Sequence, residues 1–178
     1  MVNIKTNNMK KTETGLTIVN REELQTIFAE NSLKRKGILI LGLPGRGKTW
    51  CIRQQRMVSA SKLAMEFQAY GLDAIKANIN AQISYQAARV SIDDLGIEQS
   101  VKHFGNGLDP IAWVIQSIYD INQVAEQQIQ LLMTSNLNVN ELTEKYGERI
   151  MSRIEEMCDI VVLEDTNLRK QTNSNNGV

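Results

Sequence analysis

The sequence predicts an α/β fold of three layers, in which a parallel β-sheet lies between helices. Short apolar runs rich in Ile, Val and Leu are typical of strands that are buried on both faces of a sheet. Such runs occur at residues 37–41, 89–92, 131–134 and 160–163. Segments with the helical spacing of apolar residues separate them, and strands that alternate with helices favour a parallel sheet.

The size and charge of the chain exclude several classes of protein. Its 178 residues suffice for one domain with a short extension, and Lys plus Arg equal Asp plus Glu at 20 each. Zero net charge excludes a strongly basic nucleic-acid clamp as the whole function. No apolar run approaches the roughly 20 residues of a membrane span, and the N-terminus is too polar for a signal peptide. Cys51 and Cys158 form no disulfide framework, which fits a reducing, cytoplasmic compartment.

The polar composition of both chain ends sets the expected domain boundaries. We expect residues 1–15 to be a flexible N-terminus and residues 171–178 to be a disordered tail. Residues 16–170 are then expected to form a single domain. Inside it, Asn20 and Glu23 have the spacing of a capping box that begins a helix.

The strongest local signal is the segment GLPGRGKT at residues 42–49, which matches the pattern G-x-x-x-x-G-K-[ST]. An apolar strand leads into it and a helix-compatible segment leads out, which argues against a chance glycine-rich turn. Glycines let backbone amides point inward at phosphates, and the following helix adds its positive end. Lys48 is expected to contact the β- and γ-phosphates, and Thr49 to bind Mg²⁺. The residues predicted to bind ATP are Gly42, Pro44, Gly45, Arg46, Gly47, Lys48, Thr49 and Trp50.

An acidic pair, Asp93 and Asp94, follows the strand predicted at residues 89–92. A buried strand that ends in carboxylates is the Walker B arrangement. Asp93 is predicted to hold Mg²⁺ together with Thr49, and Asp94 to act on the attacking water as a general base or polarising group. A solvated Asp-Asp turn is the alternative, but the phosphate loop upstream favours the functional interpretation.

Polar and basic residues after the next strand complete the candidate site. Asn136, at the tip of the strand at residues 131–134, is predicted to orient the attacking water, since Asn138 fits the capping of the next helix. Arg149 and Arg153 lie four positions apart and share a helix face. They are either solvated or presented to the phosphates of a neighbouring subunit.

These segments together resemble the AAA+ ATPases of the DnaC/DnaI-type helicase-loader family and the related IstB-like transposition ATPases. The matching pieces are GLPGRGKT, SIDDLG, TSNL and YGERIMSRIEEMCDIVVLED, and the resemblance covers roughly residues 21–170. It implies a P-loop NTPase with a sheet of order 5-1-4-3-2 and no separate lid domain. It also implies that Asn136 is the sensor, that Arg153 is an arginine finger acting in trans, and that Arg169 lies near the nucleotide.

The same resemblance implies a function. The expected protein hydrolyses ATP with Mg²⁺, self-associates when ATP is bound, and acts in DNA replication on a replicative helicase and single-stranded DNA. Two alternatives stay open, an IstB-like ATPase whose partner is a transposase and a nucleotide-gated adaptor with little turnover. The adaptor is considered because Asp94 stands where many AAA+ proteins carry glutamate. Family loaders carry a separate N-terminal helicase-binding domain, and too little chain precedes Arg21 for one, so the chain looks like a stand-alone ATPase core of this family.

Residues 50–80 allow two courses of the chain. In the first, a helix of about two turns follows Thr49, and residues 56–63 hold a strand and the start of the next helix. In the second, residues 48–70 form one long helix and residues 74–79 form the strand. No Pro or Gly interrupts residues 48–70, so the sequence permits both, and we favour the short helix.

Overall fold

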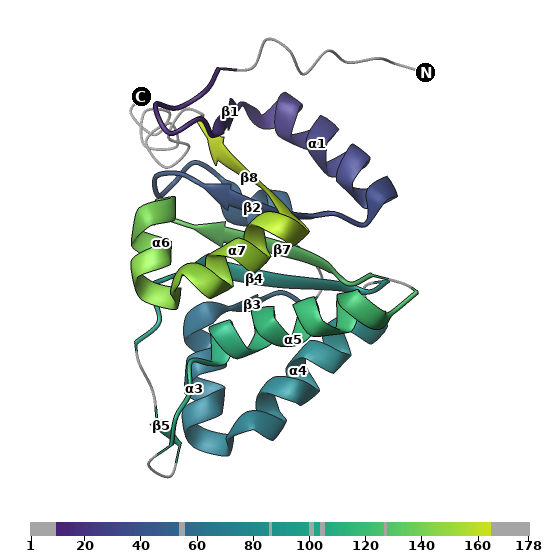
Figure 1. Cartoon of the computed structure of the whole chain (residues 1–178), viewed down its shortest axis with the longest axis vertical. Helices are drawn as coiled ribbons and strands as arrows, with labels where there is room; N and C mark the ends of the chain where they lie inside the picture. Colours follow the sequence, from purple (N-terminus) through teal and green to yellow (C-terminus); the bar gives the residue numbers. More distant parts are fainter. Residues whose placement is uncertain are drawn as a thin grey trace, which may run out of the picture.

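A six-stranded sheet with helices on both faces forms the body of the computed structural model (Figure 1). The structure describes residues 10–53, 56–85, 87–99, 102–103, 106–126 and 128–164. Arg169, the tail expected at residues 171–178 and the first part of the expected flexible N-terminus, residues 1–9, lie outside the described residues.

The elements follow one another in an order of alternating strands and helices. They are β1 (Thr17–Val19), α1 (Arg21–Lys34), β2 (Gly37–Leu41), α2 (Lys48–Ile52), β3 (Val58–Ser59), α3 (Ala60–Tyr70), α4 (Leu72–Tyr85), β4 (Arg89–Leu95), β5 (Lys102–His103), β6 (Asn106–Gly107), α5 (Pro110–Val124), β7 (Gln130–Ser135), α6 (Val139–Tyr146), α7 (Glu148–Met157) and β8 (Cys158–Leu163).

The main sheet has the strand order β1-β8-β2-β7-β4-β3, and all its neighbouring strands are parallel. If β1 is left out and the other strands are numbered along the chain from β2, the order β8-β2-β7-β4-β3 is the expected 5-1-4-3-2. The sheet is nevertheless larger than expected, because β1 adds a sixth strand beside β8, with Thr17 opposite Val161. Three residues at a sheet edge carry too little periodic pattern to be recognised from the sequence.

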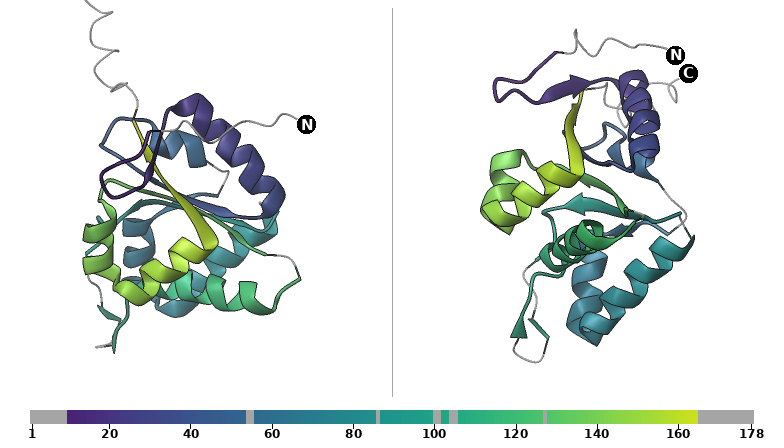
Figure 2. Two further views of the ribbon diagram at one scale, coloured as in Figure 1. Left: turned by 45° about the horizontal axis from the view of Figure 1, so that its top comes forward. Right: turned by 45° about the vertical axis from the view of Figure 1, so that its right-hand side comes forward.

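Alternation along the central strand explains how both faces of the sheet are covered. Ile38 and Ile40 pack with α1 and α2 on one face, whereas Leu39 and Leu41 pack with α3 to α7 on the other. Figure 2 shows α1 and α7 on opposite sides of the sheet. Residues 37–41 therefore form a strand that is buried on both faces, as the continuous apolar run predicted.

The chain takes the short-helix course after the phosphate loop. Helix α2 ends at Ile52, and β3 places Val58 beside Ile92 of β4. The long-helix alternative is wrong, because residues 74–79 lie inside α4. Ser59 begins α3 by accepting a hydrogen bond from the amide of Lys62 at 3.2 Å, so a new helix starts where the alternative required a continuous one.

Side-chain caps fix the starts of three other helices. Asn20 and Asn138 each form a complete capping box with the glutamate three residues later. Asp109 accepts hydrogen bonds from the amides of Ile111 and Ala112 at the start of α5.

Among the residues that the structure describes, no helix combines the length and apolar character that crossing a bilayer requires.

Candidate active site

The phosphate loop connects the carboxyl end of β2 to the first turn of α2. Gly47 has φ +88°, a left-handed conformation that side chains disfavour, and Lys48 begins the helix directly after it. A β-carbon on Gly42 would lie 2.8 Å from the carbonyl oxygen of Leu163. Glycine at these two positions is therefore required by the backbone path and by a close approach to β8.

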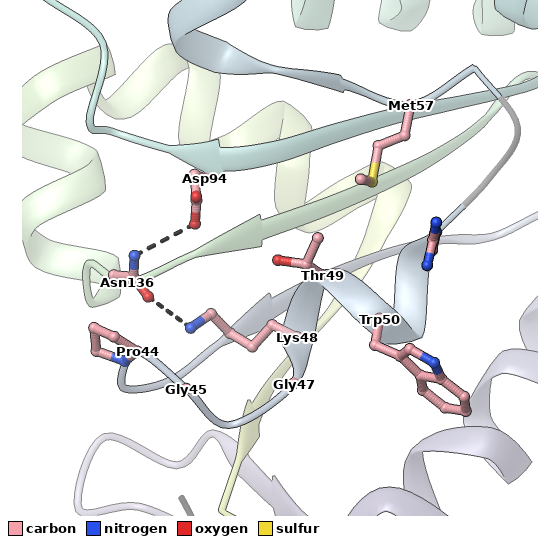
Figure 3. A pocket seen from close by; sticks show the side chains of 10 residues that line it. Pro44, Gly45, Gly47, Lys48, Thr49, Trp50, Met57, Asp94 and Asn136 are labelled. Atoms are coloured by element: carbon pink, nitrogen blue, oxygen red, sulfur yellow. Dashed lines mark hydrogen bonds between the residues drawn. The ribbon is translucent and has the colours of Figure 1, made fainter. Parts of the chain in front are cut away.

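A cavity of about 560 Å³ lies over this loop. Its lining residues come from the loop, from α2 and the residue after it, from the residue before β3 and from the ends of β4 and β7. They are Pro44, Gly45, Gly47, Lys48, Thr49, Trp50, Arg53, Met57, Asp94 and Asn136 (Figure 3). Gly42 and Arg46 instead line a neighbouring cavity of about 610 Å³, which also includes Asn136. The structure thus gathers the predicted nucleotide-binding residues around two adjoining cavities.

Lys48 stands at the centre of a chain of hydrogen bonds that crosses the first cavity. Its ammonium donates to the carbonyl oxygens of Gly42 and Leu43 at 2.6 and 3.1 Å, and to Oδ1 of Asn136 at 2.6 Å. Nδ2 of Asn136 in turn donates to Oδ1 of Asp94 at 3.3 Å (Figure 3). The side chain of Asn136 therefore connects the lysine of the phosphate loop to the second acidic residue.

Asp93 lies deeper and faces the first helical turn after the loop. It is 8% exposed, and its Oδ1 accepts hydrogen bonds from the hydroxyls of Thr49 at 3.0 Å and Thr134 at 2.5 Å. A carboxylate and a hydroxyl in direct contact are oxygen donors of the kind that Mg²⁺ binds beside nucleotide phosphates. Thr49 and Asp93 therefore fit the metal that the fold family implies.

A β-bulge in β4 explains how two adjacent carboxylates reach the same site. The register with β7 pairs Ile92 with Met133 but Leu95 with Ser135, so β4 has one more residue than β7 between these two pairs. Asp94 has φ +55° within this irregularity. Neighbouring side chains of a regular strand point to opposite faces, and the bulge removes that constraint.

The predicted arginine finger does not line either cavity. Arg153 lies on α7, where its guanidinium packs over the ring of Tyr119 on α5 at 5.0 Å. Its Nε and Nη1 atoms are buried without a hydrogen-bond partner within the described part of the chain. Arg149, one turn earlier, is exposed. The role of Arg153 towards a neighbouring subunit stays a prediction, and Arg169 falls outside the ranges that the structure describes.

Three residues of the site, Arg53, Met57 and Thr134, have no role predicted from the sequence. Arg53 and Met57 line the first cavity, the former directly after the end of α2 and the latter directly before β3. Thr134 bonds both to Asp93 and to the amide of Asp94, the latter at 3.0 Å. A hydroxyl at the end of an otherwise apolar strand, two residues before Asn136, was the available signal for Thr134.

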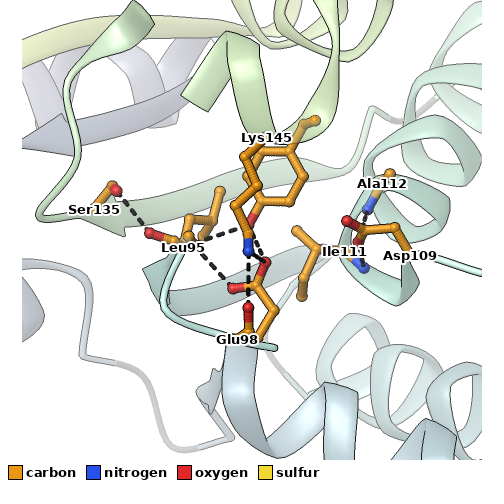
Figure 4. A network of polar contacts seen from close by, with 9 residues as sticks. Leu95, Glu98, Asp109, Ile111, Ala112, Ser135 and Lys145 are labelled. Atoms are coloured by element: carbon orange, nitrogen blue, oxygen red, sulfur yellow. Dashed lines mark hydrogen bonds and ion pairs between the residues drawn. The ribbon is translucent and has the colours of Figure 1, made fainter. Parts of the chain in front are cut away.

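A buried network fastens the segment after the acidic pair to α6 (Figure 4). Glu98 is 5% exposed and accepts hydrogen bonds from the hydroxyl of Tyr146 at 2.6 Å and the amide of Gly96 at 3.0 Å. Lys145 approaches the same carboxylate at 3.4 Å. Burial, together with this carboxylate, raises the pKa of Tyr146 far above its ordinary value, so the phenol stays a donor. Burial also raises the pKa of Asp109, which lies beside this network.

Comparison with known proteins gives the fold. No protein-family model matches the chain, and no curated protein matches it. Among solved structures, AMPPCP-bound DnaA from Aquifex aeolicus matches 88% of this chain and 53% of its own at 17% identity, with a TM-score of 0.55. The FIGL-1 AAA domain in complex with ADP matches 79% of this chain and 48% of its own at 18% identity, with a TM-score of 0.51. The chain therefore has the fold of AAA+ ATPase domains and spans about half the length of each of these proteins.

Proposed function

We propose that this chain binds ATP at the phosphate loop and hydrolyses it. The observation that carries the proposal is the hydrogen-bonded series from Lys48 through Asn136 to Asp94 inside one cavity. A cation, an amide and a carboxylate over a glycine-rich loop are the groups that phosphoryl transfer to water requires. The AAA+ fold is consistent with this use of the site.

Each residue has a separate role in the proposed reaction. Lys48 exchanges its carbonyl and amide partners for β- and γ-phosphate oxygens, and there offsets the charge that develops as the γ-phosphoryl group is transferred to water and ADP leaves. The amide of Asn136 orients the attacking water, and the carboxylate of Asp94 accepts its proton. Thr49 and Asp93 are the residues that would hold Mg²⁺. When bound, this ion neutralises charge on the phosphate oxygens.

Replacement of the loop lysine tests the proposal. Lys48→Ala should bring phosphate release from ATP down to the background rate, whereas Lys76→Ala should keep it, because Lys76 is a surface residue that contacts Asp73 on α4. Asn136→Ala should bind ATP but turn it over about 100-fold more slowly. ATP binding is measured by calorimetry and turnover by phosphate release. Wild-type protein that releases no heat on addition of Mg²⁺ and ATP would contradict the proposal.

We further propose that the ATPase acts in DNA replication as a helicase loader, with a replicative helicase and single-stranded DNA as partners. This role rests on the resemblance of the motifs to the DnaC/DnaI-type family. Affinity capture by a hexameric helicase, and faster ATP turnover with single-stranded DNA, are the expected results. Capture by a transposase instead would favour the IstB-like alternative. ATP binding with no turnover under either condition would favour the nucleotide-gated adaptor.

Self-association through a trans arginine is the remaining part of the proposal. Arg153→Ala should abolish turnover while ATP binding stays intact, because its guanidinium would complete the site of a neighbouring copy. Arg149→Ala is the matched control, since Arg149 lies one turn away on the same helix and is exposed. Turnover that survives in Arg153→Ala would refute the assignment, and turnover lost only in Arg149→Ala would transfer the role to that residue.

A further inference from the structure

Thr134 occupies the point of β7 that faces the bulge of β4. It is fully buried, and the register of the two strands shifts directly opposite it, between Met133 and Ser135. In a regular ladder the amide of Asp94 would bond to a backbone carbonyl. Here the amide donates to the hydroxyl of Thr134 at 3.0 Å, so a side chain satisfies the hydrogen bond of this amide.

The same hydroxyl also acts on the other acidic residue. It donates its one proton to Oδ1 of Asp93 at 2.5 Å while a lone pair accepts the amide proton of Asp94. The hydroxyl of Thr134 thus donates one hydrogen bond to Asp93 and accepts one from Asp94, two successive residues with different proposed roles. Asp93 is turned towards Thr49, and Asp94 faces Asn136.

We propose that Thr134 is a positioning residue, whose hydroxyl holds the β-bulge and so aims the Asp93 carboxylate at the magnesium position beside Thr49. The inference rests on the proposed ATP-binding function and adds a residue that the motifs do not assign. Thr134 lines neither of the two cavities over the phosphate loop. It acts by holding the orientation of Asp93, because a carboxylate without this donor can turn away from Thr49.

The test compares binding of a non-hydrolysable ATP analogue with magnesium chloride and with EDTA, by calorimetry. The ratio of the two affinities is called the magnesium enhancement. Thr134→Val keeps the shape and removes the hydroxyl. We expect it to lower the magnesium enhancement about tenfold, while affinity in EDTA stays within about twofold of wild type. Thr134→Ser keeps the hydroxyl and should retain the wild-type enhancement.

Ser135 provides a matched control for loss of a buried hydroxyl. Its Oγ donates to the carbonyl of Leu95 at 2.7 Å and accepts from the amide of Leu137 at 3.0 Å, with no carboxylate involved. Ser135→Ala should lower the thermal unfolding midpoint yet leave the magnesium enhancement unchanged. A general loss of packing would instead lower the enhancement equally in both variants.

The outcomes separate this inference from the proposed function. Failure of wild-type protein to bind the analogue would overturn the proposed function and the inference with it. Analogue binding with an enhancement that is absent from wild type, or undiminished in Thr134→Val, would overturn the inference alone. If Thr134→Val fails to fold, Thr134→Ser still decides the matter, because loss of the enhancement in this variant would assign the effect to the methyl group rather than the hydroxyl.

Discussion

The hydroxyl of Tyr146 offers a sharp test of the network that fastens the acidic pair to α6. Tyr146→Phe removes the donor to Glu98 at 2.6 Å and keeps the packing of the ring. The amide of Gly96, which also contacts this hydroxyl at 2.9 Å, retains its bond to the other oxygen of Glu98 at 3.0 Å. The substitution therefore removes one buried, charge-assisted hydrogen bond and one of the two acceptors of the Gly96 amide, and it leaves no amide unpaired.

The size of the effect follows from those contacts. A hydrogen bond to a charged group contributes roughly 1.5–3 kcal/mol to stability. Lys145 stays 3.4 Å from the Glu98 carboxylate and continues to compensate its charge. The expected loss is thus towards the lower end of this range, about 2 kcal/mol. For a domain of this size such a loss lowers the thermal midpoint by about 4–8 °C.

Urea denaturation followed by circular dichroism measures this loss, provided that the slope of unfolding free energy against urea is unchanged. Tyr119→Phe is the matched control, because Tyr119 also donates to a glutamate, Glu156, at 2.8 Å but at the exposed surface. Its urea midpoint should stay within experimental error. Equal losses in the two variants, or none in Tyr146→Phe, would refute the argument that burial makes the Glu98 contact strong.

Two further predictions concern stability. In Asp109→Asn the amide oxygen still caps α5, so the variant lacks only the ionisable group. In wild type, burial raises the pKa of Asp109 in the folded state, so ionisation of this carboxyl disfavours folding. The unfolding free energy of wild type minus that of Asp109→Asn should therefore fall as pH rises from about 3.8 to the raised pKa, and stay constant above it; a flat difference across this window would contradict the assignment. Gly37→Ala should lose about 1–3 kcal/mol in urea denaturation, because its β-carbon would lie 2.5 Å from the carbonyl oxygen of Leu131. An unchanged midpoint would show that β2 and β7 can separate at this point without cost.

Local rules were sufficient where the signal lies within a few neighbouring residues. The helix caps at Asn20 and Asn138 form as predicted, because each depends on side chains within one helical turn. Strand β2 and the phosphate loop at residues 42–49 form as predicted for the same reason. Five strands and their order also agree with the expectation, whereas the three-residue β1 was missed.

The sequence by itself determined the phosphate loop, the acidic pair and the α/β class of this chain, because glycine geometry, capping and apolar alternation act between near neighbours. Only the tertiary structure decided the bulge at Asp94, the contact of Thr134 with both acidic residues, and the packing of Arg153 over Tyr119. Each of these depends on the register between strands or on helices that are distant in sequence. Such registers are chosen by the packing of the whole core, so no local pattern records them.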